Sequence, residues 1–105
     1  MSLSADECPP APIPEGALAC ELLIVNKKGL HARASAKFVG TVDRFEADVT
    51  VTRCGETVGG RSIMGLLTLG AAKGTTITVT ARGDDATESL AAIRALVENR
   101  FGEEE

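Results

Sequence analysis

Apolar and polar residues alternate with two different periods along the chain, and the period switches several times between residues 20 and 101. Three segments alternate at every second position, as strands with one buried face do: residues 20–26, 48–53 and 75–81. A short return strand is expected at residues 56–59, because Cys54-Gly55 provides a tight turn before it. In three other segments the apolar residues recur at helical spacing, which predicts helices. These are residues 31–42, residues 62–69 with Gly70 after them, and a last segment that begins at residues 83–85.

The predicted order of elements is therefore β-α-β-β-α-β-α. Polar residues such as Thr50 and Thr52 take every second place in the strands, so one face of the sheet meets water and the helices share the other face. This pattern predicts an α+β open-faced sandwich: a four-stranded antiparallel sheet with three helices on one face. A ferredoxin-like arrangement with an added helix is the competing topology, since element order does not separate the two. The residues predicted to face the core are Leu22, Ile24, Ala32, Ala36, Val39, Val42, Val49, Val51, Ile77, Val79, Leu90, Ile93 and Val97.

The two ends of the chain differ in composition from the middle. All four prolines fall within residues 9–14, and proline removes the backbone donor that helices and paired strands need. We therefore expect a flexible leader at residues 1–18, one small domain at residues 19–101 and a solvated acidic tail at residues 102–105.

Charge and composition exclude several classes of function. With 15 acidic and 11 basic residues the net charge is −4, and Phe38, Phe45 and Phe101 are the sole aromatic residues, so nucleic acid is not expected as a partner. No apolar stretch reaches the roughly 20 residues that cross a bilayer. The first basic residue is Lys27, so no secretory signal is expected, and the predicted location is the cytoplasm.

The three cysteines form no CxxC pair, so the sequence predicts neither a disulfide framework nor a structural zinc site. Cys20 is expected to be buried at the start of the first strand, and Cys54 to be exposed at a turn. No metal and no cofactor are expected.

Residues 26–37 carry the candidate chemistry. This segment holds His31, the one histidine of the chain, together with four bases and no acid, although the chain as a whole is acidic. If a helix starts just after His31, the backbone N–H groups of Ala32 and Arg33 are free and carry partial positive charge. Positive surroundings keep the imidazole neutral and attract a phosphoryl group, so the segment suits a phosphate attached to nitrogen. A surface or capping histidine is the plainer alternative, and a metal ligand is disfavoured without a second histidine.

The segment Gly29-Leu-His-Ala-Arg33, followed by Ala36-Lys-Phe-Val39, resembles the active-site signature of HPr. HPr is the histidine phosphocarrier of the bacterial phosphoenolpyruvate-dependent phosphotransferase system. The likeness extends over residues 21–100 through Thr50-Val-Thr52, Arg61-Ser-Ile-Met-Gly65 and Thr68-Leu-Gly70. It implies the open-faced sandwich rather than the ferredoxin-like topology.

The resemblance also implies roles for individual residues. His31 takes a phosphoryl group on Nδ1 from phosphorylated enzyme I and passes it to an enzyme IIA-type acceptor. Arg33, with the backbone N–H groups of Ala32 and Arg33, neutralises the phosphoryl oxygens. Such a protein is a stoichiometric carrier rather than an enzyme. Ala34 departs from the proline of most sugar-type members and resembles the nitrogen-related regulatory branch, which puts a role in sugar uptake in question.

Ser62 is a second candidate site. Its spacing makes it the N-cap of the short helix, an ordinary structural role. In the HPr family, the serine that opens this helix is phosphorylated by HPr kinase/phosphorylase, which implies regulation by repulsion of incoming phosphoproteins. A protein-binding module controlled mainly through Ser62 is therefore the alternative function.

The short helix holds more apolar residues than it can bury. We call Ala36, Ile63, Met64 and Leu67 the apolar rim, which the resemblance implies to be the docking surface for partners around His31. The protein is expected to act as a monomer. A small ferredoxin-like module that binds metal or nucleic acid is a third reading, which the charge, the few aromatic residues and the lone histidine disfavour.

Overall fold

The computed structural model describes residues 8–105, and the predicted order of elements is confirmed. A short 3₁₀ turn, η1, follows the last helix, and residues 1–7 of the expected leader lie outside the described part. The elements are β1 (Leu18–Leu23), α1 (Ala32–Val42), β2 (Asp48–Arg53), β3 (Glu56–Gly59), α2 (Ile63–Thr68), β4 (Thr76–Arg82), α3 (Ala86–Glu98) and η1 (Arg100–Gly102).

The four strands form one antiparallel sheet in the order β1-β4-β2-β3. In this order β1 and β3 are the edges, whereas a ferredoxin-like sheet places its first and third strands in the centre. The open-faced sandwich is therefore the correct one of the two predicted topologies. Leu22 of β1 lies opposite Ile77 of β4, and Val51 of β2 lies opposite Val79, so the apolar faces of the strands coincide.

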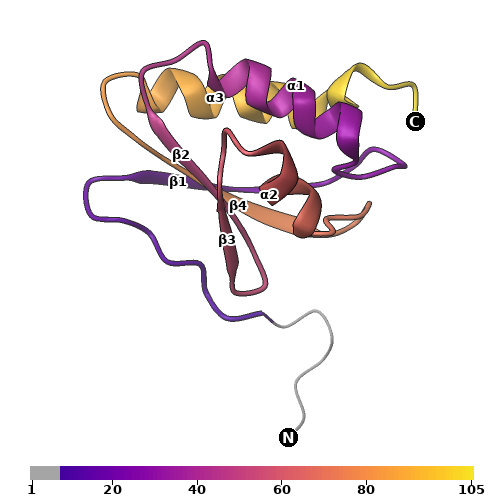
Figure 1. Ribbon diagram of the computed structural model, residues 1–105, viewed down its shortest axis with the longest axis horizontal. Helices are drawn as coiled ribbons and strands as arrows, with labels where there is room; N and C mark the ends of the chain where they lie inside the picture. Colours follow the sequence, from indigo (N-terminus) through magenta and orange to yellow (C-terminus); the bar gives the residue numbers. More distant parts are fainter. Residues whose placement is uncertain (1–7) are drawn as a thin grey trace, which may run out of the picture.

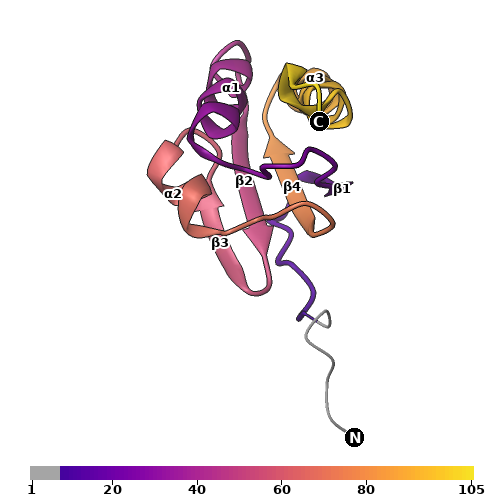
Figure 2. The same ribbon diagram turned by 90° about the vertical axis from the view of Figure 1, so that its right-hand side faces the viewer.

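All three helices cover the same face of the sheet, as Figures 1 and 2 show, and the other face, called the open face below, carries no helix within residues 8–105. The core lies between the sheet and this helical layer. Its largest fully buried apolar side chains are Phe38, Phe101, Ile24, Leu66, Ile77, Ile93, Val42, Val51, Val79 and Val97.

The buried face of α1 differs from the predicted one. Ala32 and Ala36 are exposed and Val39 is half-buried, whereas Phe38 is fully buried together with Ala34 and Val42. Both sets recur at spacings of three or four residues, and Val42 belongs to both, so periodicity alone does not choose between them. Phenylalanine removes far more apolar surface from water than alanine does, and its burial sets the rotation of the helix.

The first strand also begins and ends earlier than predicted. It covers Leu18–Leu23 rather than residues 20–26, and Leu18 therefore belongs to the folded domain instead of the leader. Ile24 remains buried beyond the strand, where its N–H donates to the Thr75 carbonyl at 2.9 Å. Cys20, expected to be buried, is half-buried because β1 is an edge strand.

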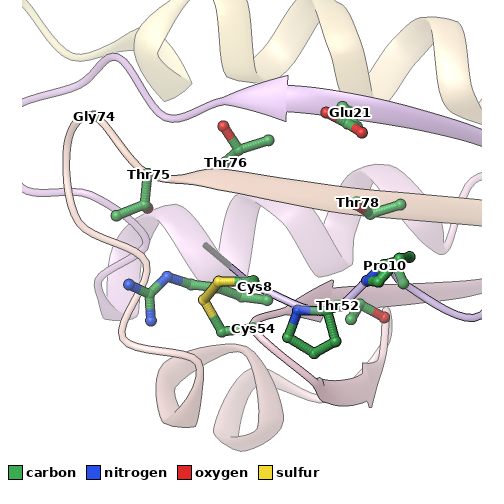
Figure 3. Close-up of a pocket in the computed structure, with 12 residues that line it drawn as sticks. Cys8, Pro10, Glu21, Thr52, Cys54, Gly74, Thr75, Thr76 and Thr78 are labelled. Atoms are coloured by element: carbon green, nitrogen blue, oxygen red, sulfur yellow. A yellow bond between two sulfur atoms is a disulfide. The ribbon is translucent and has the colours of Figure 1, made fainter. Parts of the chain in front are cut away.

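A disulfide joins Cys8 in the leader to Cys54 in the β2–β3 turn, so the prediction that the cysteines form no disulfide framework is wrong for this pair. The leader crosses the open face of the sheet, and a cavity of about 410 Å³ lies between Pro9–Ala11 of the leader and the threonine side chains of β2 and β4 (Figure 3). His31 does not line this cavity. The two cysteines are 46 positions apart, so their proximity depends on the tertiary path of the leader and leaves no local trace in the sequence.

Two further findings bear on function. None of the helices in residues 8–105 is long and apolar enough to span a membrane. Within the same residues, no group of three His, Cys, Asp or Glu side chains is arranged to hold a metal ion.

Candidate functional site

The connection between β1 and α1 is held in a defined conformation by Gly29. Its φ of +66° lies in the left-handed region, and a Cβ atom there would collide with the carbonyl of Ala71. The next N–H group, that of Leu30, donates to that same carbonyl at 2.9 Å, and the Leu30 side chain is buried. The connection therefore lies close against the backbone at residues 71–72, and this contact fixes where His31 emerges.

His31 is the N-cap residue of α1. Its carbonyl accepts the first helical hydrogen bond from the Ser35 N–H at 2.8 Å, while its imidazole caps no backbone group. The side chain is 27% exposed, so it is both held by the protein and open to a partner. The N–H groups of Ala32 and Arg33 occupy the first turn of α1 and have no acceptor among residues 8–105. Arg33 is exposed on the same turn.

The acidic tail folds back onto this site, so the prediction of a fully solvated tail is wrong. The Glu103 carboxylate lies 2.5 Å from His31 Nε2 through one oxygen and accepts from Asn26 Nδ2 at 3.0 Å through the other. Asn26 is fully buried, and its Nδ2 also donates to the Gly29 carbonyl at 2.8 Å. Of the three terminal glutamates, Glu103 is half-buried, whereas Glu104 is exposed.

Three further contacts determine the path of the tail. Lys37 of α1 donates to the carbonyl of the buried Phe101 at 2.6 Å, and the Lys27 N–H donates to the Glu105 carbonyl at 2.6 Å. The Lys27 ammonium also lies 3.6 Å from the Glu105 carboxylate. Arg100, Phe101 and Gly102 all have positive φ, which turns the chain sharply after α3 and brings the C-terminus beside the β1–α1 connection (Figure 1).

The hydrogen bond with His31 lowers the pKa of the Glu103 carboxyl below its ordinary value of 4.5. Burial opposes this effect, while the hydrogen bond from Asn26, the charge that His31 carries when protonated and the charge of Lys28 add to it. Glu103 is therefore a carboxylate at neutral pH and serves as an acceptor for both neighbours.

The second helix presents the other predicted residues. Ser62 is the N-cap of α2, and its Oγ accepts from the Gly65 N–H at 2.9 Å, which confirms the expected capping role. In the apolar rim, Met64 is 72% and Ile63 39% exposed, Leu67 is half-buried and Ala36 is exposed. The helix α2, which carries three of these residues, packs against α1, which carries Ala36.

Asn26 and Glu103 are site residues for which the sequence predicts no role. Asn26 is the last residue of the predicted first strand and the first of the segment at residues 26–37, and Glu103 is one of three consecutive glutamates with no distinguishing neighbour. Phe101, an apolar residue after the end of the last helix, is the sequence feature that indicates an anchored tail. A buried aromatic so near the C-terminus anchors the residues that follow it.

Comparison with known proteins identifies relatives of this chain. The family model described as "PTS HPr component phosphorylation site" matches residues 18–99. A phosphocarrier protein HPr from Xylella fastidiosa is 44% identical over 80% of this chain and 94% of its own length. One from Neisseria meningitidis is 49% identical over 78% and 92%. The crystal structure of HPr-C-His from Thermoanaerobacter tengcongensis superposes with a TM-score of 0.80 at 39% identity, covering 84% of this chain and 99% of that one. The chain therefore belongs to the HPr family of phosphocarrier proteins of the phosphotransferase system.

Proposed function

We propose that His31 accepts a phosphoryl group on Nδ1 from phosphorylated enzyme I and passes it to an enzyme IIA-type acceptor. The observation that carries this proposal is the position of His31. Its imidazole is partly exposed at the N-terminus of α1, beside N–H groups with no acceptor in the described residues, in a segment rich in bases. An attached phosphoryl group is stabilised there by the helix terminus and by Arg33.

The protein itself is a carrier rather than an enzyme in this proposal. Phosphoryl transfer between two proteins requires positioning and charge stabilisation more than covalent assistance. Arg33 can turn toward the phosphoryl oxygens because it is exposed and forms no ion pair within residues 8–105. The backbone N–H groups of Ala32 and Arg33 supply the remaining donors.

The test of this relay uses enzyme I, phosphoenolpyruvate and intact-mass measurement. The wild-type protein is expected to gain one acid-labile phosphoryl group and to lose it when an enzyme IIA-type acceptor is added. His31→Ala is expected to remain folded and to gain none, because His31 is partly exposed and its imidazole caps nothing. Full uptake by the His31→Ala variant would refute the proposal.

The apolar rim is the proposed docking surface for both partners. Exposed Met64 and Ile63 supply adaptable apolar contacts, which suit a carrier that meets several proteins in turn. Met64→Glu is expected to slow phosphoryl uptake, whereas Leu23→Glu serves as the control because Leu23 is 54% exposed on β1. Equal slowing by both substitutions would show that the rim has no special role.

Ser62 is the proposed site of regulation by HPr kinase/phosphorylase. Its side chain is exposed, so it is accessible to a kinase, and a phosphate at the N-terminus of α2 is electrostatically compatible with the helix. The added charge would oppose the docking of a phosphorylated donor. The alternative function, a binding module controlled mainly through Ser62, predicts partner binding that responds to Ser62→Asp even when His31 is absent.

The remaining expectations concern the state of the protein in the cell. We propose a cytoplasmic monomer, and sedimentation should return the chain mass of 10.9 kDa. The Cys8–Cys54 disulfide is unusual for a reducing compartment, so its state in freshly lysed cells tests the location.

Ala34, at the position where most sugar-type members have proline, favours an acceptor of the nitrogen-related branch. Rates of phosphoryl transfer to acceptors of both branches test this choice of acceptor.

A further inference from the structure

The C-terminal tail contributes a side chain to the imidazole of His31. Glu103 lies beyond residue 99, where the match to the family model ends, so its part in the site is read from this structure. A neutral imidazole carries its proton on one nitrogen and a lone pair on the other, and the neighbours of each nitrogen decide which. The identity of the neighbour at Nε2 therefore has a chemical consequence at Nδ1.

We infer that Glu103 is a positioning residue for His31: its carboxylate accepts from Nε2–H and so leaves the Nδ1 lone pair free for the phosphoryl group. A carboxylate can only accept hydrogen bonds, and Glu103 Oε2 lies 2.5 Å from Nε2, so the proton of the neutral ring is held on Nε2. The inference rests on the proposed function and names the residue that selects the nucleophilic nitrogen.

The carboxylate is held in place from its other side. Its Oε1 accepts from Asn26 Nδ2, whose second hydrogen bond goes to the Gly29 carbonyl. Because Asn26 is fully buried, this amide is a rigid support rather than a mobile surface group. Glu103 is thereby tied to the connection that carries His31.

The backbone of the tail is strained in a way that serves the same contact. Arg100 and Phe101 have φ values of 56° and 55°, a conformation that residues other than glycine rarely adopt. Full burial of Phe101 and the hydrogen bond from Lys37 to its carbonyl hold this turn. This turn directs the residues that follow it toward His31 instead of into solvent.

The transfer step explains why a carboxylate is useful at Nε2. The Nδ1 lone pair attacks phosphorus, a P–Nδ1 bond forms, and the bond from phosphorus to the donor atom breaks with its electron pair staying on the donor. The proton remains on Nε2, so the ring becomes a phosphorylated imidazolium. The negative charge of Glu103 stabilises this cation, and in the reverse direction the ring leaves as neutral imidazole with its Nε2 proton.

Nitrogen-15 NMR of the histidine ring in the unphosphorylated protein, recorded with the ring in its neutral form, reports the tautomer directly. The wild type is expected to show the Nε2–H form alone, and Glu103→Ala a mixture of both forms. Glu103→Gln is expected to retain the Nε2–H form, because its amide oxygen still accepts. Glu104→Ala is the matched control, since it removes the same charge from an exposed neighbour whose side chain makes no hydrogen bond or ion pair within residues 8–105.

Rates of phosphoryl uptake separate the two effects of Glu103. Loss of one charge-assisted hydrogen bond is expected to slow uptake by about tenfold or more in Glu103→Ala. Glu103→Gln should be slowed as well, since it keeps the tautomer but not the charge. A tautomer ratio in Glu103→Ala equal to that of Glu104→Ala would overturn the inference. If the wild type takes up no phosphoryl group, the proposed function fails, yet the NMR comparison still decides the role of Glu103.

Discussion

Gly29 shows how one residue controls the position of the candidate site. Replacing it with alanine places a Cβ against the Ala71 carbonyl in a left-handed conformation, so we expect Gly29→Ala to lower the free energy of unfolding by about 2 kcal/mol or more. Gly40 is the matched control, because it lies in α1 and a Cβ there meets nothing within 4 Å. Gly40→Ala should raise stability by about 0.5–1 kcal/mol. Urea denaturation of both variants checks the pair, and equal stability changes would refute this reading.

The contribution of Glu103 to the free energy of unfolding depends on pH. Its pKa in the folded protein lies below 4.5, so its contribution to stability is complete above that value and disappears as the pH falls through the folded pKa. Glu103→Gln is expected to cost about 1 kcal/mol at neutral pH and progressively less at an acidic pH below 4.5. Chemical denaturation at both pH values measures the difference, with Glu104→Gln as the control. A cost that is independent of pH would contradict the assigned contact.

At the scale of elements, the N-terminus of α2 combines capping with proposed regulation. Ser62→Ala removes the acceptor for the Gly65 N–H and should lower stability by about 1 kcal/mol, whereas Ser62→Asp retains a cap. For the rate of phosphoryl uptake, we expect Ser62→Asp rather than Ser62→Ala to have the larger effect. Ser62→Asp is expected to slow uptake because it adds negative charge near the docking surface, and Ser62→Ala is expected to leave uptake unchanged. Equal uptake rates for the two variants would argue against regulation through repulsion.

The elements also show what the sequence could and could not predict. Alternation in residues 48–53 and 75–81 identified two central strands correctly, because each has one buried and one polar face. The predicted buried face of α1 is correct at Val42 and wrong at Ala32 and Ala36, since the alanine stripe and the stripe through Phe38 both recur at helical spacing and tertiary packing chooses between them. His31 and Ser62 were found because each begins a helix, which is a local signal. Glu103 was missed because its contact with His31 spans 72 positions.

At the scale of the whole molecule, the disulfide fastens the leader to the β2–β3 turn. Protein purified without reductant should contain one free thiol, that of Cys20, and three after reduction. Reduction, or Cys8→Ser, is expected to lower the free energy of unfolding by up to about 4 kcal/mol, because the bond closes a loop of 46 residues in the unfolded chain. Phosphoryl uptake should not change, since His31 does not line the cavity beneath the leader. Three free thiols before reduction would contradict this account.

The whole molecule acts as a scaffold that presents one imidazole nitrogen to successive partners. The most direct test is a proton–phosphorus NMR correlation spectrum of the protein after reaction with enzyme I and phosphoenolpyruvate. A phosphoryl group on Nδ1 of His31 couples to the ring proton Hε1 but not to Hδ2, because a single ring C–H carbon adjoins Nδ1. That pattern is the result we predict. Coupling of phosphorus to both ring protons, which marks Nε2, or to no histidine proton at all would contradict the account.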